Sequence, residues 1–299
     1  MDFQRQDIAF SSDGDCVRGW LYTPRPGSEP WPAIVMAHGF GAVKEMYLDR
    51  FAESFAAAGF AVLLFDYRRL GASDGVPRQE IDPATQIEDY RNAMTWIAAQ
   101  EEVDAERIGI WGTSYSGGHV LIVAATDPRV KCVVSQVPTI SGNAVAKRRF
   151  TPDKIDDSAK ANAQDRLARM QGAAPKVWNL VPHGSGDPAV YSAPDAVEWY
   201  TNAARRGGGW RNEVTLRSLE YSRAYEPGAW VSFISPCPLL MIVADRDAIT
   251  PTDLALGAYE QARQPKRLEM IRGGHFEAYT TAFDTVSGAA RDWFVRHLL

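Results

Sequence analysis

Three residue types that together can perform acyl transfer follow one another along this chain: a serine, then acids, then a histidine. Ser114 lies in the segment GIWGTSYSGGHVL, residues 109–121. Asp245 and Asp247 come at the end of a later apolar run, and His275 follows the next one. A serine hydroxyl becomes a strong nucleophile when an imidazole takes its proton and a carboxylate orients that imidazole. These residue types therefore make Ser114 a candidate nucleophile, His275 a candidate base and one of the two aspartates a candidate orienting acid, from three distant parts of the chain.

Ser114 stands at a corner between two predicted elements, a buried strand over 107–112 and a helix over 115–126. Gly112 precedes it and Gly117-Gly118 follow, which permits a tight turn and close packing. The N-terminus of a helix favours developing negative charge. A plain turn serine is the alternative interpretation, and the matching acid and histidine favour a nucleophile.

Apolar runs alternate with helical patterns on both sides of this corner. The predicted strands cover 33–39, 60–67, 107–112, 130–137, 237–247 and 266–275. The predicted helices cover 44–59, 82–100, 115–126, 251–262 and 281–299, and Asp82-Pro83 is a typical helix beginning. Two β-like runs around Ser12-Asp13-Gly14-Asp15 predict an N-terminal hairpin. Continuous apolar strands that alternate with helices indicate a mostly parallel sheet covered on both faces, with a site at the carboxyl ends of its strands.

The alternation stops between residues 138 and 235, where the chain is more charged and irregular. A loop of this length without structure of its own is implausible, so we expect a helical lid. The predicted division is an α/β core over 1–137 and 236–299 with the lid over 138–235. Within the lid, His183, Trp178 and Trp210 are candidate substrate contacts.

The strand, serine corner and helix resemble the nucleophile elbow of the α/β-hydrolase superfamily. The order of serine, acid and histidine is also that of the family. The usual Gly-x-Ser-x-Gly pattern is altered, because Ser116 replaces the second glycine and Gly117 follows it. The spacing from Ala244 to Thr250-Pro251 resembles the family pattern around Asp247, with Asp245 as the alternative acid.

Further segments are similar to loops of this family. AHGFG, residues 37–41, resembles its oxyanion loop, which implies that the backbone N–H groups of Phe40 and Tyr115 bind the oxyanion. In that loop His38 is expected to shape the backbone and not to act as a base. His119 is expected in the core or behind the site. DYRRLGASDG, residues 66–75, also resembles a family loop, and its Asp66 and Arg68 are expected to be structural.

Within the superfamily, GTSYSGG resembles the Xaa-Pro-peptidase and dienelactone-hydrolase-like branches, and the overall size is similar to polyketide-transferase relatives. The peptidases of that branch carry an additional C-terminal β domain. This chain ends soon after His275, so we expect it to have none.

Composition excludes several other classes of function. The net charge of −5 comes from 32 basic and 37 acidic residues, which disfavours nucleic acid as a partner. No apolar run approaches the about 20 residues that a membrane helix needs. Three scattered cysteines and a start without a signal-peptide pattern favour the cytoplasm.

The sequence thus predicts a serine hydrolase that cleaves carboxylic esters through an acyl-enzyme, without metal or cofactor. Two alternatives stay open: an acyltransferase that uses the same intermediate, and a ligand-binding member of the fold without activity. The expected partner is a small-molecule ester, and a homodimer is also an open alternative.

Overall fold

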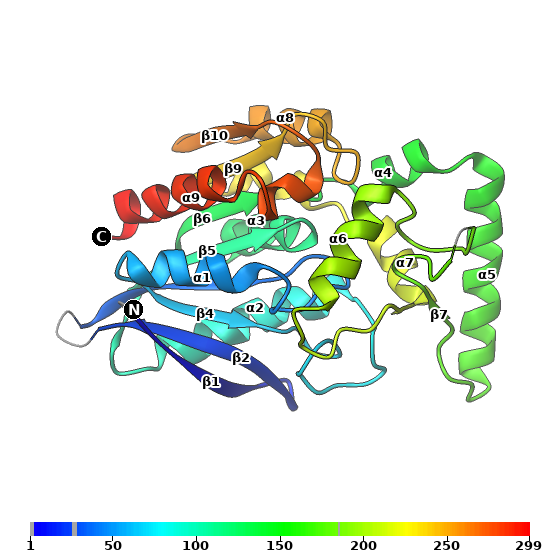
Figure 1. The fold of residues 1–299 in the computed structure, drawn as a ribbon, viewed down its shortest axis with the longest axis horizontal. Coiled ribbons are helices and arrows are strands. Elements are labelled where there is room, and N and C mark those ends of the chain that lie inside the picture. Colours follow the sequence, from blue (N-terminus) through cyan, green and yellow to red (C-terminus); the bar gives the residue numbers. More distant parts are fainter. Residues whose placement is uncertain (1–2, 26–28, 185) are drawn as a thin grey trace.

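An eight-stranded sheet forms the centre of the computed structural model, which describes residues 3–25, 29–184 and 186–299 (Figure 1). The order across the sheet is β1-β2-β4-β3-β5-β6-β9-β10. β1 and β2 form an antiparallel hairpin and β2 runs antiparallel to β4, whereas all other neighbouring strands are parallel. The mostly parallel sheet expected from the sequence is confirmed. The strands are β1 (Phe3–Ser12), β2 (Asp15–Pro24), β3 (Trp31–Ala37), β4 (Ala61–Phe65), β5 (Val103–Thr113), β6 (Val130–Gln136), β9 (Leu239–Ala244) and β10 (Lys266–Ile271).

Helices cover both faces of this sheet. α1 (Leu48–Ala57) and α9 (Phe283–Leu298) pack on one face, and α2 (Pro83–Ala98), α3 (Tyr115–Thr126) and α8 (Thr252–Gln261) on the other. Alternate side chains of a strand point to opposite faces of the sheet. In β3, Val35 packs with α2 and α3, whereas Ile34 and Met36 pack with α1. Burial on both faces explains why the strands are continuous apolar runs.

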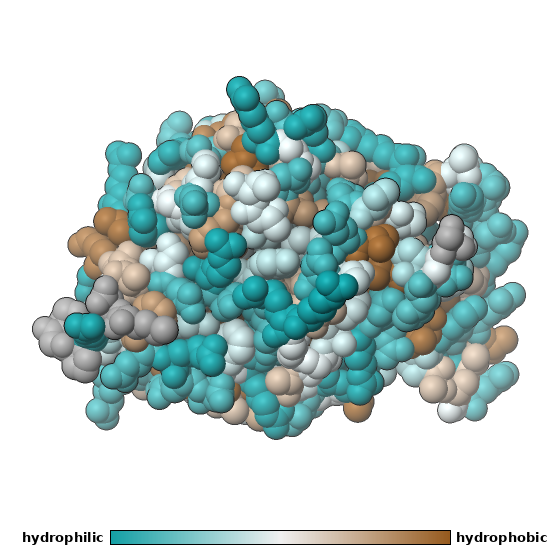
Figure 2. Space-filling view, in the orientation of Figure 1, coloured by the Kyte–Doolittle hydropathy of each residue, from teal (hydrophilic) through white to brown (hydrophobic). Residues whose placement is uncertain are grey.

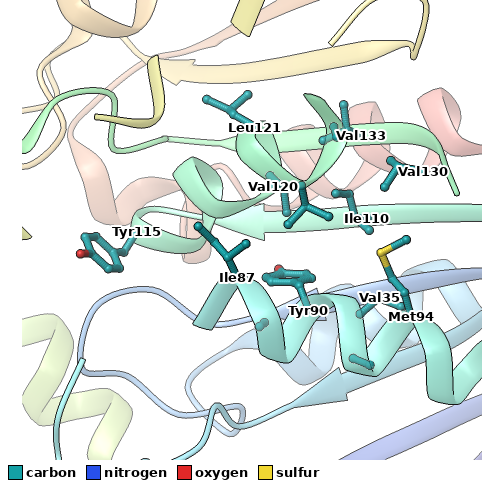
Figure 3. Close-up of a cluster of buried hydrophobic side chains, with 14 of the residues drawn as sticks. Val35, Ile87, Tyr90, Met94, Ile110, Tyr115, Val120, Leu121, Val130 and Val133 are labelled. Carbon is teal, nitrogen blue, oxygen red and sulfur yellow. The ribbon is translucent and has the colours of Figure 1, made fainter. Parts of the chain in front are cut away.

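Figure 3 shows the layer on the α2 and α3 side, where side chains of both helices meet those of β3, β5 and β6. This packing fixes α3, and therefore the corner from which α3 begins. The labelled residues of this layer include Val35, Ile87, Tyr90, Met94, Ile110, Val120, Leu121, Val130 and Val133.

Most predicted elements of the core are present with slightly different ends. The side chain of Asp82 caps α2 by accepting a hydrogen bond from Ala84 N at 3.0 Å, with Pro83 in the first turn. The helix predicted over 44–59 begins only at Leu48. The backbone N–H and the ammonium of Lys44 are both bonded to Asp66, each at 2.8 Å, so this residue belongs to the preceding loop.

Between β6 and β9 the chain forms a helical cap at the end of the sheet where the parallel strands finish (Figure 1). α5 lies far from the sheet, while α6 lies closer to it. A short 3₁₀ segment, η1 (Pro227–Phe233), packs on α3 and α8 of the core. The other cap elements are α4 (Gly142–Arg149), α5 (Pro152–Met170), α6 (Pro194–Ala204) and α7 (Leu216–Arg223), with the paired strands β7 (Val177–Trp178) and β8 (Val214–Thr215).

The surface shown in Figure 2 is mostly hydrophilic, with hydrophobic residues in small separate patches. Across the described ranges, no helix combines the length and the apolar character needed to span a bilayer. Within those same ranges, no cluster of three or more His, Cys, Asp or Glu residues has a metal-binding arrangement.

Candidate active site

Ser114 occupies the sharp corner between β5 and α3. Its backbone has φ 58° and ψ −116°, a conformation that non-glycine residues rarely adopt. Two backbone hydrogen bonds hold this corner: Ser114 N donates to Gln136 O at 2.8 Å, and Thr139 N donates to Ser114 O at 2.9 Å. The strained conformation therefore depends on the neighbouring strand β6, and it presents the side chain at the carboxyl end of the sheet.

Glycines make room for this corner where the sequence indicated. A Cβ at Gly112 would lie 2.2 Å from the carbonyl oxygen of Ser116, so a side chain there would force β5 and α3 apart. A Cβ at Gly39 would lie 2.9 Å from that of Ser114. The loop after β3 approaches the serine closely because it has glycine at this position.

Ser116, which replaces the usual second glycine, is completely buried and fully bonded. The Tyr67 hydroxyl donates to Ser116 Oγ at 2.9 Å, and Ser116 Oγ lies 2.8 Å from the Tyr90 hydroxyl. Tyr90 in turn donates to the Trp111 carbonyl at 2.7 Å. The substitution is tolerated because two tyrosines satisfy the buried hydroxyl.

The structure brings Ser114, His275 and Asp247 together from three separate strand ends. His275 Nε2 lies 3.0 Å from Ser114 Oγ, and His275 Nδ1 lies 2.7 Å from Asp247 Oδ2. All three residues are at most 9% exposed. In this geometry Nδ1–H donates to the carboxylate and leaves Nε2 free to accept the proton of the serine.

Asp247, and not Asp245, is the acid that contacts the histidine. Asp245 Oδ1 instead accepts a hydrogen bond from Gly273 N at 2.8 Å, and its side chain is 43% exposed. Burial alone would raise the pKa of Asp247, but the charge of His275 and hydrogen bonds from His275 and Thr250 outweigh it and lower the pKa. The carboxylate is thus held in its charged form.

Thr250 supports this acid in a way the sequence did not indicate. Its backbone N–H donates to Asp247 Oδ1 at 2.8 Å, and its hydroxyl lies 2.8 Å from Asp247 Oδ2. The same hydroxyl also lies 3.0 Å from the Val137 carbonyl oxygen, so its single proton is within reach of both acceptors. The Thr-Pro spacing marked the position of Thr250, but its contacts depend on how β6 and β9 lie beside each other.

The two predicted oxyanion donors come from segments that flank Ser114. Tyr115 is the first residue of α3, so its N–H has no acceptor within the helix. Within the described part of the chain, the Phe40 N–H donates to no other backbone group. Both residues line the cavity that reaches Ser114. Both N–H groups are therefore without a backbone acceptor, which is a requirement for oxyanion donors.

Contacts from the cap hold the loop that carries Phe40. The Tyr200 hydroxyl of α6 donates to the Phe40 carbonyl at 2.6 Å, and Trp210 Nε1 donates to the Gly41 carbonyl at 2.8 Å. The side chain of Leu180 packs so closely on Gly41 that a Cβ there would lie 2.6 Å from it. No periodicity or motif pointed to these contacts, which join segments more than 100 residues apart.

A buried cluster of charged side chains also supports the loop that carries Phe40, on the side that faces the core. Lys44 Nζ lies 2.8 Å from Asp66 Oδ2 and 2.7 Å from Glu45 Oε1. His38 Nε2 lies 3.6 Å from Asp66 Oδ1, and burial lowers the pKa of His38. His38 therefore lies beside Asp66 and helps to shape this loop. Both residues have structural contacts there.

A cavity of about 420 Å³ opens onto Ser114 beneath the cap. Apolar side chains from α4, α7 and the segment around β7 make up much of its wall, whereas α5 contributes mainly polar ones. Its charged members are Arg149, Lys154, Asp157 and Arg223. Such a shape suits a molecule with a substantial apolar part. The apolar and aromatic lining includes Phe40, Tyr115, Val145, Ala146, Phe150, Trp178, Val190, Tyr191, Leu216, Leu219 and Ile249.

The three lid candidates have different positions. Trp178 lines the cavity. His183 is exposed and is not part of the cavity lining, whereas Trp210 donates a hydrogen bond to Gly41 in the loop that carries Phe40. His119 lies in the core, where its Nδ1 is 2.7 Å from the Tyr225 hydroxyl and its Nε2 is 2.9 Å from Gln86 Oε1.

Comparisons with known proteins agree with this architecture. The chain is 36% identical over 284 residues to the quorum-quenching protein AidA of Acinetobacter baumannii. This alignment covers 94% of this chain and 91% of that protein. It is 34% identical to the thiohydrolase aneE of Aspergillus aculeatus, over 93% of this chain and 88% of that one. The crystal structure of the α/β hydrolase GrgF from a Penicillium species superposes with a TM-score of 0.86, at 29% identity, over 99% of both chains.

These relatives indicate a hydrolase or acyl-transferring enzyme, and the expected α/β-hydrolase fold is confirmed. A sequence model of the X-Pro dipeptidyl-peptidase (S15) family matches residues 13–277, which include the serine corner, the acid and the histidine. The chain belongs to the X-Pro dipeptidyl-peptidase (S15) family and has the α/β-hydrolase fold.

Proposed function

We propose that this protein hydrolyses carboxylic esters through an acyl-enzyme formed on Ser114. The observation that carries the proposal is the continuous chain of contacts from Ser114 Oγ through His275 to Asp247 at the end of an apolar cavity. A nucleophile, a base and an orienting acid in hydrogen-bond contact form the arrangement required for acyl transfer.

In the first half of the reaction, Ser114 Oγ attacks the ester carbonyl while His275 Nε2 takes the hydroxyl proton. The N–H groups of Phe40 and Tyr115 stabilise the negative oxygen of the tetrahedral intermediate. His275 then gives its proton to the departing alcohol, and Asp247 stabilises the imidazolium throughout. In the second half, water attacks the acyl-enzyme while His275 Nε2 takes its proton. His275 then returns this proton to Ser114 Oγ as the bond to the acyl group breaks and the acid is released.

The space around the serine supports hydrolysis. A second cavity of about 20 Å³ is lined by Ser114, His275 and Thr113, among others. This volume is about that of one water molecule, and hydroxyl and imidazole groups can bind it. A water held beside the imidazole is suitably placed to attack the acyl group.

The cavity lining favours esters over X-Pro peptides. A dipeptidyl-peptidase has to hold the positively charged amine of its substrate, which requires carboxylates near the serine. Among the described residues that line the large cavity, Asp157 is the single acid, and Arg149, Lys154 and Arg223 are also present. A neutral or anionic substrate suits this set of charges better than a cationic one.

Acyl transfer to an alcohol or a thiol is the second candidate, and the cap is the feature that favours it. A covered cavity limits access of bulk water to the acyl-enzyme. The fungal protein grgF, named a polyketide transferase, is 29% identical over 98% of this chain, and aneE is named a thiohydrolase. Product analysis with increasing concentrations of an acceptor alcohol separates the two: a transferase forms the new ester in preference to the free acid.

The test of the main proposal is turnover of p-nitrophenyl acetate by the wild type and Ser114→Ala. We expect the substitution to lower kcat by about 10⁴-fold or more, because the nucleophile is lost. Labelling of the wild type by a fluorophosphonate, and not of Ser114→Ala, is expected in parallel. Equal turnover by both proteins contradicts the proposal, and an inert Ser114 favours the ligand-binding alternative.

We further propose that the protein acts in a reducing compartment such as the cytoplasm, since Cys16, Cys132 and Cys237 are free thiols. The small-molecule ester as binding partner remains a prediction from the sequence, and so does the homodimer as an alternative to a monomer.

A further inference from the structure

The side chain of Tyr115 carries a buried hydroxyl without a partner. Tyr115 is 3% exposed, and its Oη has no hydrogen bond to any of the described residues. The ring of Tyr115 packs against three aromatic rings. The distances from its centroid to those of Phe40, His119 and Tyr225 are 5.2 Å, 4.9 Å and 4.9 Å. A buried hydroxyl left unpaired is unfavourable, so this position needs an explanation.

Neighbouring tyrosines show that the core can satisfy such groups. Tyr225, in ring contact with Tyr115, has its hydroxyl 2.7 Å from His119 Nδ1. Tyr67 and Tyr90 both have hydroxyl contacts to Ser116. Tyr115 differs from these three because it also lines the large cavity, directly after Ser114. Tyr115 therefore borders the cavity as well as the core, and its hydroxyl lies outside the hydrogen-bond network that the other three tyrosines form.

The orientation of the ring agrees with this position. Figure 3 shows Tyr115 at the beginning of α3, set apart from the other labelled side chains and with its oxygen pointing away from them. The half-buried Ser222 of α7 also lines the cavity, and its hydroxyl approaches that of Tyr115 closely enough to act on it as a hydrogen-bonding group, which partly opposes the rise that burial causes in the pKa of Tyr115. The contact between the two hydroxyls lacks the geometry of a full hydrogen bond, so the hydrogen-bonding capacity of the Tyr115 hydroxyl is not used up.

The hydroxyl of Tyr115 remains a neutral donor under all ordinary conditions. Burial raises the pKa of Tyr115 well above its usual range, and the nearby Ser222 only partly opposes this. A neutral donor beside a hydroxyl that can donate or accept suits a ketone or alcohol oxygen. It is less suited to a fully ionised group, which binds better to cations.

We propose that Tyr115 Oη and Ser222 Oγ form a polar subsite that binds an oxygen atom carried on the acyl chain of the substrate. The inference rests on the proposed acyl-enzyme chemistry at Ser114, since that chemistry places the acyl chain in this cavity. The preferred substrates are then oxo- or hydroxyacyl compounds, and a simple alkanoyl chain leaves the Tyr115 hydroxyl unpaired.

The experiment compares p-nitrophenyl octanoate with octanoates that carry one oxo group at carbon 3, 5 or 7. For the wild type we expect at least one oxo ester to exceed octanoate by roughly tenfold in kcat/KM, the effect of one neutral hydrogen bond. In Tyr115→Phe this ratio falls to about one, whatever happens to the absolute rate, because the ring stays and only the hydroxyl is lost. Ser222→Ala is expected to reduce the ratio in part.

The control is Tyr225→Phe, which removes a neighbouring buried hydroxyl that is bonded inside the core, so it is expected to keep the wild-type ratio. Equal kcat/KM for all esters in the wild type, or an unchanged ratio in Tyr115→Phe, overturns the proposal. Binding provides a readout independent of turnover: oxo-octanoates are titrated against octanoate into Ser114→Ala, alone and combined with Tyr115→Phe. An oxo preference in Kd that disappears with Tyr115→Phe supports the subsite even if no ester is hydrolysed, and equal Kd values contradict it.

Discussion

The hydroxyl of Tyr200, on the cap helix α6, donates a 2.6 Å hydrogen bond to the carbonyl oxygen of Phe40, on the loop after β3. Phe40 supplies one of the two proposed oxyanion donors, so this bond links the cap to the position of a donor. Both residues are buried, at 5% exposed each, and bulk water has little access to replace the bond. The cap therefore does more than cover the cavity, because it also holds part of the proposed catalytic machinery.

Tyr200→Phe is expected to lower kcat for p-nitrophenyl acetate by about tenfold, with little change in KM. The loss leaves the Phe40 carbonyl unpaired and frees the loop to move, and oxyanion donors act mainly in the transition state. Tyr221→Phe, which removes the same atom from cap helix α7, is the matched control and is expected to keep the wild-type kcat. An equal fall in both variants, or a change confined to KM, argues against positioning by Tyr200.

Asp247→Asn is expected to reduce kcat by about 10⁴-fold, since the amide cannot stabilise the imidazolium that forms on His275. Asp245→Asn changes the neighbouring acid, which is bonded to Gly273 N and partly exposed, so its effect on kcat is expected to stay below about tenfold. Steady-state kinetics of the two variants checks this. A larger loss for Asp245→Asn than for Asp247→Asn reverses the assignment of the acid.

Ser116→Ala is expected to lower the free energy of unfolding by about 1–3 kcal/mol. The substitution leaves the donating Tyr67 hydroxyl without its acceptor in a buried site. Urea unfolding followed by circular dichroism measures the change. Thr126→Ala, at the exposed end of α3, is the control and is expected to change the unfolding free energy by less than about 1 kcal/mol. Similar stabilities for Ser116→Ala and the wild type contradict a structural role for the tyrosine contacts.

His119 is expected to make stability depend on acid pH. Burial lowers its pKa to about 3, whereas an unfolded histidine has a pKa of about 6.5. Between these values the unfolded chain binds a proton that the folded protein does not, so the unfolding free energy falls as the pH falls. The loss from this one group is at most about 1.4 kcal/mol per pH unit below about 6.5.

His119→Gln removes the group that titrates, so its unfolding free energy is expected to decrease less steeply from pH 6.5 to pH 4.5 than that of the wild type. The comparison concerns slopes, because the variant also loses contacts to Tyr225 and Gln86 and is less stable at neutral pH. Urea unfolding at several pH values measures both slopes. Parallel slopes show that His119 does not contribute to the acid sensitivity.

Local patterns were sufficient to predict the sheet, its helices and the corner at Ser114. Strands buried on both faces have to be continuous apolar runs, and Gly112 is needed where a side chain would collide with Ser116 O, so these features are visible in the sequence. The start of α1 was predicted too early because the sequence does not show that Lys44 is bonded to Asp66. A contact between distant segments overrode a helical pattern at that point.

The sequence by itself determined which residue types could act, and in which order: Ser114, an acid after β9, and His275. The spacing to Thr250-Pro251 favoured Asp247 through the family resemblance and kept Asp245 as the alternative, because both acids follow the same strand. Only the three-dimensional path of the loop places the Asp247 carboxylate 2.7 Å from His275 Nδ1. The tertiary structure also decided the roles of Tyr200 and Trp210, whose partners lie more than 100 residues away, and it places the Thr250 hydroxyl between Asp247 and the distant Val137 carbonyl. Hydrogen bonds of this kind leave no periodic signal, because they depend on where packed elements meet and not on the spacing of residues within one element.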